Sequence, residues 1–338
     1  MIHLLYGELA KARRRYYERR PNARRRLRAP VISVGGLTVG GSGKTPVVAA
    51  LARLLLDMGE RPAILSRGYA RERGADGVVV ASDGTSILSD VAHAGDEPFM
   101  LAHAVQGVAV LVSPNRYLAG RLAETRFACS VHLLDDGFQH FELVRTIDLL
   151  VTPPSELEDT RTLPRGRLRE PLDTAAVADA LLVPVDEGTT PLNMAKRLRV
   201  AEAFGIERAI EPPRPLRMSG WPTEGSPMRA FAVAGIARPE RFFADLGRMG
   251  WQLTGTLRFP DHHCYSTRDV AETIHAAQKS GANVILTTEK DRVRLPDSIV
   301  QPDAPIAWAS VPLRVSFDTA FRPWLERRLA RGRAGDAA

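Results

Sequence analysis

A glycine-rich loop between an apolar run and a helical pattern limits the fold of this chain more than any other feature. Residues 31–34 are typical of a buried strand, and five glycines follow between Gly35 and Gly43. The segment then reads Gly43-Lys44-Thr45, and from Pro46 apolar residues recur at the spacing of one helix face. In a strand–loop–helix context this motif predicts phosphate binding, because N–H groups of the loop and the helix N-terminus face the anion.

The residues of this loop have predicted roles in nucleotide binding. Lys44 is expected to reach the β- and γ-phosphates, and the Thr45 hydroxyl is expected to bind Mg²⁺. The strict motif has glycine where this chain has Thr38. The alternative is a tight strand–helix turn without ligand, but a turn alone has no use for the Lys-Thr pair. The predicted nucleotide-binding residues are Thr38, Val39, Gly40, Gly41, Ser42, Gly43, Lys44 and Thr45.

The length and composition are those of a globular protein with ample core. The chain has 338 residues, which predicts two domains or one large domain with an attachment. Hydrophobic residues make up 44% and charged residues 25%. The two cysteines, Cys129 and Cys264, are far apart, so a disulfide framework or zinc site is not expected, and a reducing compartment is favoured.

The positive charge is concentrated in an N-terminal arm. The net charge is +7, yet residues 1–30 hold ten Lys or Arg against two Glu. Residues Ile2, Leu5, Leu9 and Tyr16 can form an apolar stripe beside these arginines, as in a helix that lies on an anionic membrane. A solvated basic arm, or one that binds nucleic acid, is the alternative. No run of 18 apolar residues occurs, and the charges follow the apolar part, unlike in a secretory signal.

Strand and helix patterns alternate along most of the chain. This alternation predicts a P-loop NTPase-like α/β fold, with a doubly wound, mostly parallel sheet and a second, smaller α/β domain. Residues 211–228 contain five prolines, which marks the boundary between the domains. The predicted organisation is a basic amphipathic segment (1–30), a P-loop domain (31–212), a proline-rich linker (213–228), a smaller α/β domain closing over the active site (229–317), and a C-terminal helix with a disordered tail (318–338).

Two aspartates follow the apolar strand pattern at residues 131–134. Alone, Asp135-Asp136 commonly marks a turn. About 90 residues after a P-loop, the pair instead predicts the acidic half of a nucleotide site, where an aspartate holds Mg²⁺ directly or through water. Residues 137–140 follow directly and are expected at the same edge of the sheet.

Asp96 stands in the sequence Gly-Asp-Glu-Pro at a predicted helix start. Aspartate there is a good N-cap, so a structural role is the default interpretation. Phosphoryl transfer to a hydroxyl also requires a carboxylate that orients the acceptor or takes its proton.

Two adjacent histidines, His262 and His263, follow Asp261 in the second predicted domain. Adjacent side chains point in different directions, so the pair is poorly suited to bind one metal ion. Structural histidines are the default, and a histidine paired with a carboxylate across an interdomain cleft is the alternative.

Arginines recur in predicted loops at Arg67, Arg116 and residues 165–169, and their guanidinium groups suit phosphate oxygens. Solvation at the surface is the alternative for any one of them. The sequence Glu289-Lys290-Asp291 resembles a guanine-binding motif only superficially, because the asparagine and the spacing differ, so a GTPase would lack its element for base recognition.

These motifs together resemble the tetraacyldisaccharide 4'-kinase family of lipid A biosynthesis, in order and over residues 31 to about 295. Thr38 in place of glycine is also typical of that family. The matching segments are 37–46, 66–69, 95–98, 115–116, 135–140, 168–171, 234–236, 261–263 and 288–291.

The resemblance implies a peripheral enzyme on the cytoplasmic face of the bacterial inner membrane. It would transfer the γ-phosphate of ATP, with Mg²⁺, to the 4'-hydroxyl of a tetraacylated glucosamine disaccharide 1-phosphate. It implies that Asp96 is the base, supported by His262 or His263, and that Lys44 contacts the phosphates. Thr45, Asp135 and Asp136 would be the Mg²⁺ ligands. Candidate substrate or nucleotide contacts are Tyr69, Arg116, Gln139, Arg169 and Glu170.

The N-terminus departs from the family pattern, because members often carry a longer apolar anchor. A soluble P-loop ATPase with an arm that binds nucleic acid is the second hypothesis. A nucleotide-dependent membrane adaptor without enzymatic activity is the third.

Overall fold

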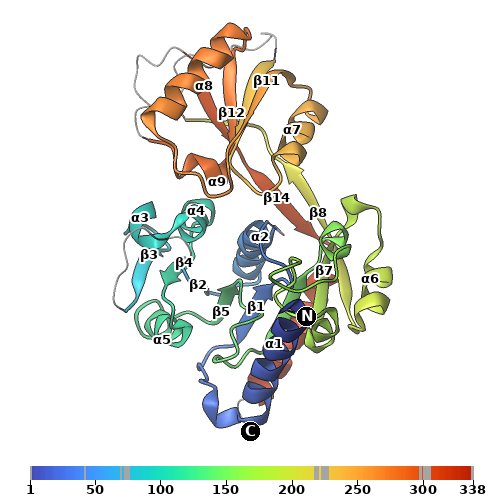
Figure 1. Cartoon of the computed structure of the whole chain (residues 1–338). Helices are drawn as coiled ribbons and strands as arrows, with labels where there is room; N and C mark the ends of the chain where they lie inside the picture. The colour runs from blue at the N-terminus through green and yellow to red at the C-terminus, as the bar shows by residue number, and fades with distance from the viewer. Residues whose placement is uncertain are drawn as a thin grey trace. The chain divides into compact units, whose positions relative to one another are not determined.

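The computed structural model describes residues 2–41, 43–68, 71, 77–216, 221, 228–296, 299 and 306–335. The chain forms two compact units. Unit 1 comprises Met1–Arg208 and Val315–Ala338, and unit 2 comprises Ala209–Arg314 (Figure 1). Unit 2 is therefore an insertion between two segments of unit 1. Most of the predicted linker, and the last three residues of the predicted tail, lie outside the described residues.

Unit 1 is built on a nine-stranded sheet with the order β14-β8-β7-β6-β1-β5-β2-β4-β3. The pairings from β8 to β4 are parallel, and β3 pairs with β4 in the antiparallel direction. The strands are β1 (Val31–Gly35), β2 (Pro62–Ser66), β3 (Val79–Asp83), β4 (Ala109–Val112), β5 (Val131–Asp135), β6 (Ile147–Val151), β7 (Ala180–Pro184), β8 (Ala203–Ile210) and β14 (Leu313–Phe317).

Both faces of this sheet are buried, as expected for parallel strands. One core contains side chains of α2, α4 and α10, while α5 and α6 contribute to cores that include the opposite side chains of the same strands. The helices and 3₁₀ turns of unit 1 are α1 (Ile2–Arg19), η1 (Pro21–Ala23), α2 (Lys44–Asp57), α3 (Val91–Ala94), α4 (Asp96–Ala104), α5 (Arg116–Arg126), η2 (Pro154–Leu157), η3 (Leu172–Val177), η4 (Val185–Glu187), α6 (Pro191–Leu198) and α10 (Phe321–Gly335).

The C-terminal helix α10 completes the first of these cores. Phe321, Trp324, Leu325 and Leu329 are buried there. The Phe321 ring lies 5.3 Å from that of Phe204 on β8, centroid to centroid. Helix α10 therefore packs against a strand that lies more than a hundred residues earlier in the sequence.

The strand order places the nucleotide motifs side by side. Strand β1 pairs with β5, so the loop after β1 and the aspartates after β5 emerge at the same edge of the sheet. Strand β2 lies beyond β5, whereas β6 lies on the other side of β1. The strand order thus reverses beside β1, and such a switch point is where open α/β sheets bind ligands.

Unit 2 has a five-stranded sheet with the order β11-β10-β12-β13-β9, in which β9 alone is antiparallel. Helices α7 and α8 contribute to two different cores, on alternate side chains of β10 and β12. The elements are β9 (Arg214–Pro215), β10 (Arg229–Ala234), α7 (Pro239–Arg248), β11 (Gln252–Arg258), α8 (Thr267–Lys279), β12 (Val284–Thr288), α9 (Glu289–Arg292) and β13 (Ala307–Val311).

The fold class predicted from the sequence is confirmed. The structure adds four strands that the sequence patterns do not predict, which are β8, β9, β13 and β14. Among the described residues, no helix has both the length and the apolar character that crossing a membrane requires.

Candidate active site

The glycine-rich loop has the backbone geometry of a phosphate-binding loop. Gly40 and Gly43 have φ values of +89° and +76°, which residues with a side chain rarely adopt. Gly43 is the N-cap of α2, so the helix begins at Lys44 and its first N–H groups face the loop. Thr45, one residue further, is buried. Ser42 lies outside the described residues.

The Thr38 side chain makes a hydrogen bond that glycine could not make. Thr38 is 1% exposed, and its hydroxyl donates a hydrogen bond to the buried carboxylate of Glu156 in η2. Its backbone forms an antiparallel bridge with Leu168, which is extended geometry that any residue adopts. The departure from the strict motif therefore adds a contact to the loop without backbone strain.

The arginine-rich segment 161–170 is hydrogen-bonded to the first residues of the glycine-rich loop. The N–H of Val39 donates to the carbonyl of Arg167 at 2.9 Å, and the Arg167 guanidinium donates back to the carbonyl of Val39 at 2.7 Å. The N–H of Arg169 donates to the carbonyl of Leu37 at 2.7 Å. These arginines are therefore parts of the loop scaffold.

The pKa values of the two carboxyl groups at the end of β5 are shifted in opposite directions. Burial, followed by the charges of Glu97 and Asp136, raises the pKa of Asp135 to about 7. Burial also raises the pKa of Asp136, but Lys44 and Arg169 outweigh it and bring this pKa below its ordinary value. Lys44 Nζ lies 3.5 Å from Asp136 Oδ1, and Arg169 donates to Asp136 Oδ2 at 2.5 Å.

Gln139 connects Arg169, which contacts Asp136, to Glu170. Its Nε2 donates to the carbonyl of Gly36 at 3.1 Å and to Glu170 Oε1 at 3.0 Å, and its Oε1 accepts from Arg169 at 3.4 Å. Lys44, Asp136, Arg169, Gln139 and Glu170 thus form one connected set of polar contacts.

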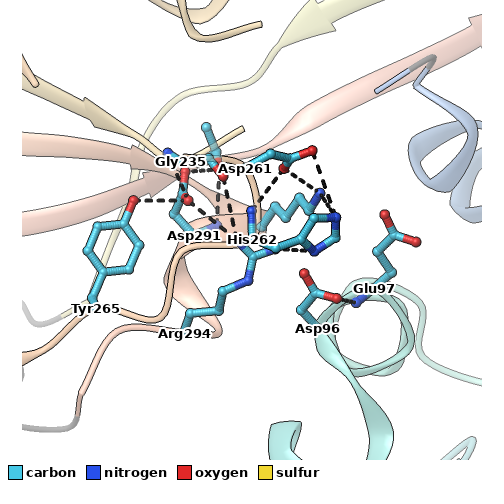
Figure 2. A network of polar contacts seen from close by, with 10 residues as sticks. Asp96, Glu97, Gly235, Asp261, His262, Tyr265, Asp291 and Arg294 are labelled. Carbon is cyan, nitrogen blue, oxygen red and sulfur yellow. Dashed lines mark hydrogen bonds and ion pairs between the residues drawn. The ribbon is translucent and has the colours of Figure 1, made fainter. Parts of the chain in front are cut away.

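Asp96 begins helix α4 and is 6% exposed. Its Oδ1 accepts from the N–H of Glu97 at 2.9 Å, which fixes the orientation of the carboxylate (Figure 2). Since the Glu97 charge acts on Asp135, the start of α4 lies near the acidic pair within unit 1.

Arg116 begins helix α5 in a basic environment. Its side chain is buried, and its Nε has no hydrogen-bond partner. Burial, followed by the charge of Arg67, lowers its pKa to about 10, while the charges of Asp135, Asp136 and Glu142 act in the opposite direction. Burial and four arginines, of which Arg116 has the largest effect, lower the pKa of His140 to about 3. This part of unit 1 therefore favours an anion.

The two histidines of unit 2 have different surroundings. His263 Nε2 lies 3.1 Å from Asp269 in the capping box of α8, and its ring stacks on Phe259. His262 has a φ of +65°, with Lys290 Nζ 3.3 Å from its Nε2. An Arg294 nitrogen lies 3.4 Å from its Nδ1 (Figure 2).

A buried aspartate supports the His262 segment. Asp291 is 0% exposed and accepts from the Tyr265 hydroxyl and from the N–H of Gly235, both at 3.0 Å (Figure 2). Lys290 Nζ also lies 3.0 Å from Asp261. His263 therefore has the contacts of a structural residue, whereas His262 lies among the charged side chains of Asp261, Lys290 and Arg294.

Comparison with known proteins identifies the family. The sequence model of the tetraacyldisaccharide-1-P 4'-kinases matches residues 1–330. The chain belongs to this family. A tetraacyldisaccharide 4'-kinase of Desulfotalea psychrophila is 39% identical over 305 residues, covering 86% of this chain and 85% of the relative. That of Geobacter sulfurreducens is 39% identical over 300 residues, covering 86% and 82%.

A solved structure agrees with this assignment. The LpxK protein of Aquifex aeolicus, crystallised in complex with ATP, superposes with a TM-score of 0.76 at 30% identity and covers 97% of both chains. The predicted family, fold and kinase activity in lipid A biosynthesis are confirmed, and a soluble ATPase with a nucleic-acid-binding arm is not favoured.

The acidic pair of this 4'-kinase fits a nucleotide-bound Mg²⁺ ion better than a site made of protein ligands alone. The described part of the chain has no group of three or more His, Cys, Asp or Glu side chains able to hold a metal. Mg²⁺ in nucleotide sites commonly uses one or two protein oxygens together with phosphate oxygens. Asp136 Oδ1 already faces one cation, the Lys44 ammonium at 3.5 Å, and the raised pKa of Asp135 reflects burial and negative charge that a second cation would offset.

Two residues of unit 1 carry no sequence signal that identifies them. Glu156 lies outside every motif, and Arg14, which donates to Glu170, is one of three consecutive arginines. The burial of Arg14 could not be predicted from that run. Among the predicted contacts, Tyr69 lies outside the described residues.

Proposed function

We propose that the glycine-rich loop binds the phosphates of ATP, with Lys44 beside the β- and γ-phosphates. The observation that carries this proposal is the contact between Lys44 and Asp136, which joins the loop after β1 to the acidic pair after β5. The positive φ of Gly40 and Gly43 supports it, because such backbone presents N–H groups to an anion. Thr45, Asp135 and Asp136 would hold Mg²⁺, which neutralises phosphate charge in such sites.

The reaction that we propose is transfer of the γ-phosphoryl group to the 4'-hydroxyl of a tetraacylated glucosamine disaccharide 1-phosphate. Asp96 takes the proton of that hydroxyl as the hydroxyl oxygen attacks phosphorus and the bond to ADP breaks. The fixed orientation of its carboxylate suits this role, since a base needs a defined geometry. Lys44 stabilises the negative charge on the phosphoryl oxygens.

Of the two histidines, we assign the supporting role to His262. His263 already contacts Asp269 and Phe259, and both contacts serve the start of α8. His262 has an uncommon backbone conformation and charged neighbours at both ring nitrogens, which fits a side chain held for function.

The basic environment of Arg116 suits the phosphate group that the acceptor already carries. Arg116 Nε has no partner, and burial makes an unpaired donor costly unless an anion binds there. Arg169 is the second candidate contact, because a quarter of its side chain is exposed beside Asp136. Glu170 and Gln139 are engaged with protein partners, so we assign them to positioning, and Tyr69 stays a sequence-based candidate.

We propose that α1 lies on the cytoplasmic face of the inner membrane as a peripheral attachment. Its exposed apolar side chains are Ile2, Leu4, Leu5, Tyr6, Leu9 and Tyr16, with exposed fractions between 37% and 66%. Exposed arginines accompany them, a combination that favours an anionic lipid surface. Substituting Leu5 and Leu9 with glutamate should abolish sedimentation with vesicles that contain phosphatidylglycerol, and unchanged sedimentation would refute this assignment.

One assay tests the proposed reaction. The purified chain is incubated with labelled ATP, Mg²⁺ and the disaccharide lipid in detergent, and phosphorylated lipid is measured. We expect Asp96→Asn to lose at least 100-fold in kcat while it still binds ATP. Asp90→Asn is the matched control, because Asp90 caps the neighbouring helix α3 and asparagine also caps well. Turnover in the Asp96 variant at the rate of the control would refute the base assignment.

A further inference from the structure

Helix α1 has a buried side as well as the exposed apolar side proposed to face lipid. Arg14 is 5% exposed, whereas its neighbours Arg13 and Arg15 are exposed. A buried arginine in a helix rich in solvated arginines needs a specific partner, because an unpaired buried charge is strongly destabilising.

That partner is Glu170, which is 1% exposed. Arg14 Nε and Nη2 donate to the two Glu170 carboxylate oxygens at 2.7 and 2.9 Å, a bidentate pair. The Arg14 guanidinium also lies over the rings of Phe138 and Phe141, at 4.5 and 4.7 Å from their centroids. Phe138 belongs to the segment that follows the acidic pair, so Arg14 contacts that segment directly.

The other contacts of α1 reach the segment that holds the phosphate-binding loop. The Thr162 hydroxyl donates to the carbonyl of His3, and Lys11 pairs with Asp173 at 2.6 Å. Gly7 allows close approach, since a Cβ there would lie 3.1 Å from Pro171 Cγ. The helix therefore packs against residues that flank Glu170 on both sides.

Glu170 connects Arg14 to the nucleotide site. The Gln139 amide nitrogen donates to Glu170 and to Gly36, which leaves Gln139 Oε1 for Arg169. Arg169 in turn donates to Asp136, which lies beside Lys44. The two hydrogen bonds from Arg14 fix the Glu170 carboxylate, and the same Oε1 that accepts from Arg14 Nη2 also accepts from Gln139.

We propose that Arg14 is a positioning residue for phosphoryl transfer, acting from helix α1 through Glu170, Gln139 and Arg169 on Asp136. This inference rests on the proposed function of Asp136 and Lys44 at the phosphates. The N-terminal helix is then part of the active-site scaffold in addition to a membrane attachment.

The test compares two arginines of the same helix in detergent solution, where vesicle attachment plays no part. Arg14→Gln should lower kcat at least tenfold, with a smaller change in the KM for ATP. Arg15→Gln removes the same charge from an exposed position and should change kcat less than twofold. Equal kcat values for the two variants would overturn the proposal.

A second comparison separates positioning from folding. In a Gln139→Ala background, where the connection is already broken, adding Arg14→Gln should change kcat less than twofold. A tenfold loss in that background as well would show that Arg14 acts by another route and would overturn the proposal. If Arg14→Gln does not fold, Arg14→Lys keeps the charge but loses the fork and should lower kcat severalfold, and full activity of that variant would overturn the proposal.

These outcomes differ from failure of the proposed function. A wild-type chain that yields no phosphorylated lipid would refute the proposed reaction. A wild-type chain that yields product, together with a fully active Arg14→Gln variant, would refute the positioning role alone.

Discussion

Replacing Thr38 with valine removes the hydroxyl that contacts Glu156 and leaves the shape of the side chain nearly unchanged. Glu156 is 4% exposed, so its carboxylate would stay buried after losing this donor. A hydrogen bond to a charged group contributes about 1.5–3 kcal/mol. We expect the free energy of unfolding of unit 1 to fall by about 2 kcal/mol.

Two further substitutions at Thr38 allow the four residues to be ranked by stability. Serine keeps the hydroxyl and loses one methyl group, so it should cost no more than about 1 kcal/mol. Glycine restores the strict motif, but it loses the hydrogen bond and the methyl group and adds about 0.5–1 kcal/mol of backbone entropy, so about 4 kcal/mol is expected. The predicted order of stability is threonine, serine, valine and then glycine.

The assay is urea unfolding without nucleotide, with hydrogen exchange of the β1 and α2 amides as the probe of unit 1. The midpoint should move while the m-value stays constant, since the surface exposed on unfolding hardly changes. A glycine variant as stable as the wild type would refute the reasoning. Thr38 would then be a tolerated replacement of glycine with no contribution of its own.

Three further predictions follow from other groups. Because the native pKa of Asp135 is about 7, above the ~3.9 of an unfolded aspartate, the native state keeps a proton that the unfolded chain releases between about pH 4 and pH 7. Stability should therefore fall as the pH rises through that window, by at most about 4 kcal/mol, and urea unfolding of Asp135→Asn should lack this slope. His262→Ala should lower kcat with little change in melting temperature, whereas His263→Ala should lower the melting temperature, and the reverse pattern would contradict the assignment of the two histidines. Burial raises the pKa of the Cys129 thiol to about 12, so at pH 8 iodoacetamide should modify the exposed Cys264 first, as mass spectrometry of peptides would show.

The parts of the site that the sequence predicts are those formed by short, contiguous segments. The loop from Gly35 to Thr45 and the pair Asp135-Asp136 each follow a four-residue segment with three apolar residues, which is the pattern of a buried strand. A parallel sheet brings the ends of such strands to one edge, so their proximity follows from the fold class. Local sequence was therefore sufficient to predict this cluster.

The contacts that the sequence does not predict depend on distant segments. Arg14 and Glu170 are 156 positions apart, and Thr38 and Glu156 are 118 apart. Nothing in the run Arg13-Arg14-Arg15 distinguishes the buried member, because the selection depends on Phe138 and Phe141. The choice between His262 and His263 likewise depends on Asp269, which also caps a helix.

Strands β8 and β14 are not predicted either, because they lack the apolar pattern of a central strand. Their patterns mix apolar with charged residues, which are Glu207 and Arg208 in β8 and Arg314 in β14. Each runs across a border between the units, so neither shows the uniform burial of a central strand.

The insertion of unit 2 into unit 1 has a consequence for biosynthesis. A core of unit 1 includes Phe321, Trp324, Leu325 and Leu329, which the ribosome makes after unit 2. Unit 2, a continuous segment that ends at Arg314, is complete before them. Domains generally fold as their chains emerge. During translation the inserted unit can therefore fold first, while the phosphate-binding unit still lacks helix α10 and exposes apolar surface to which a chaperone can bind.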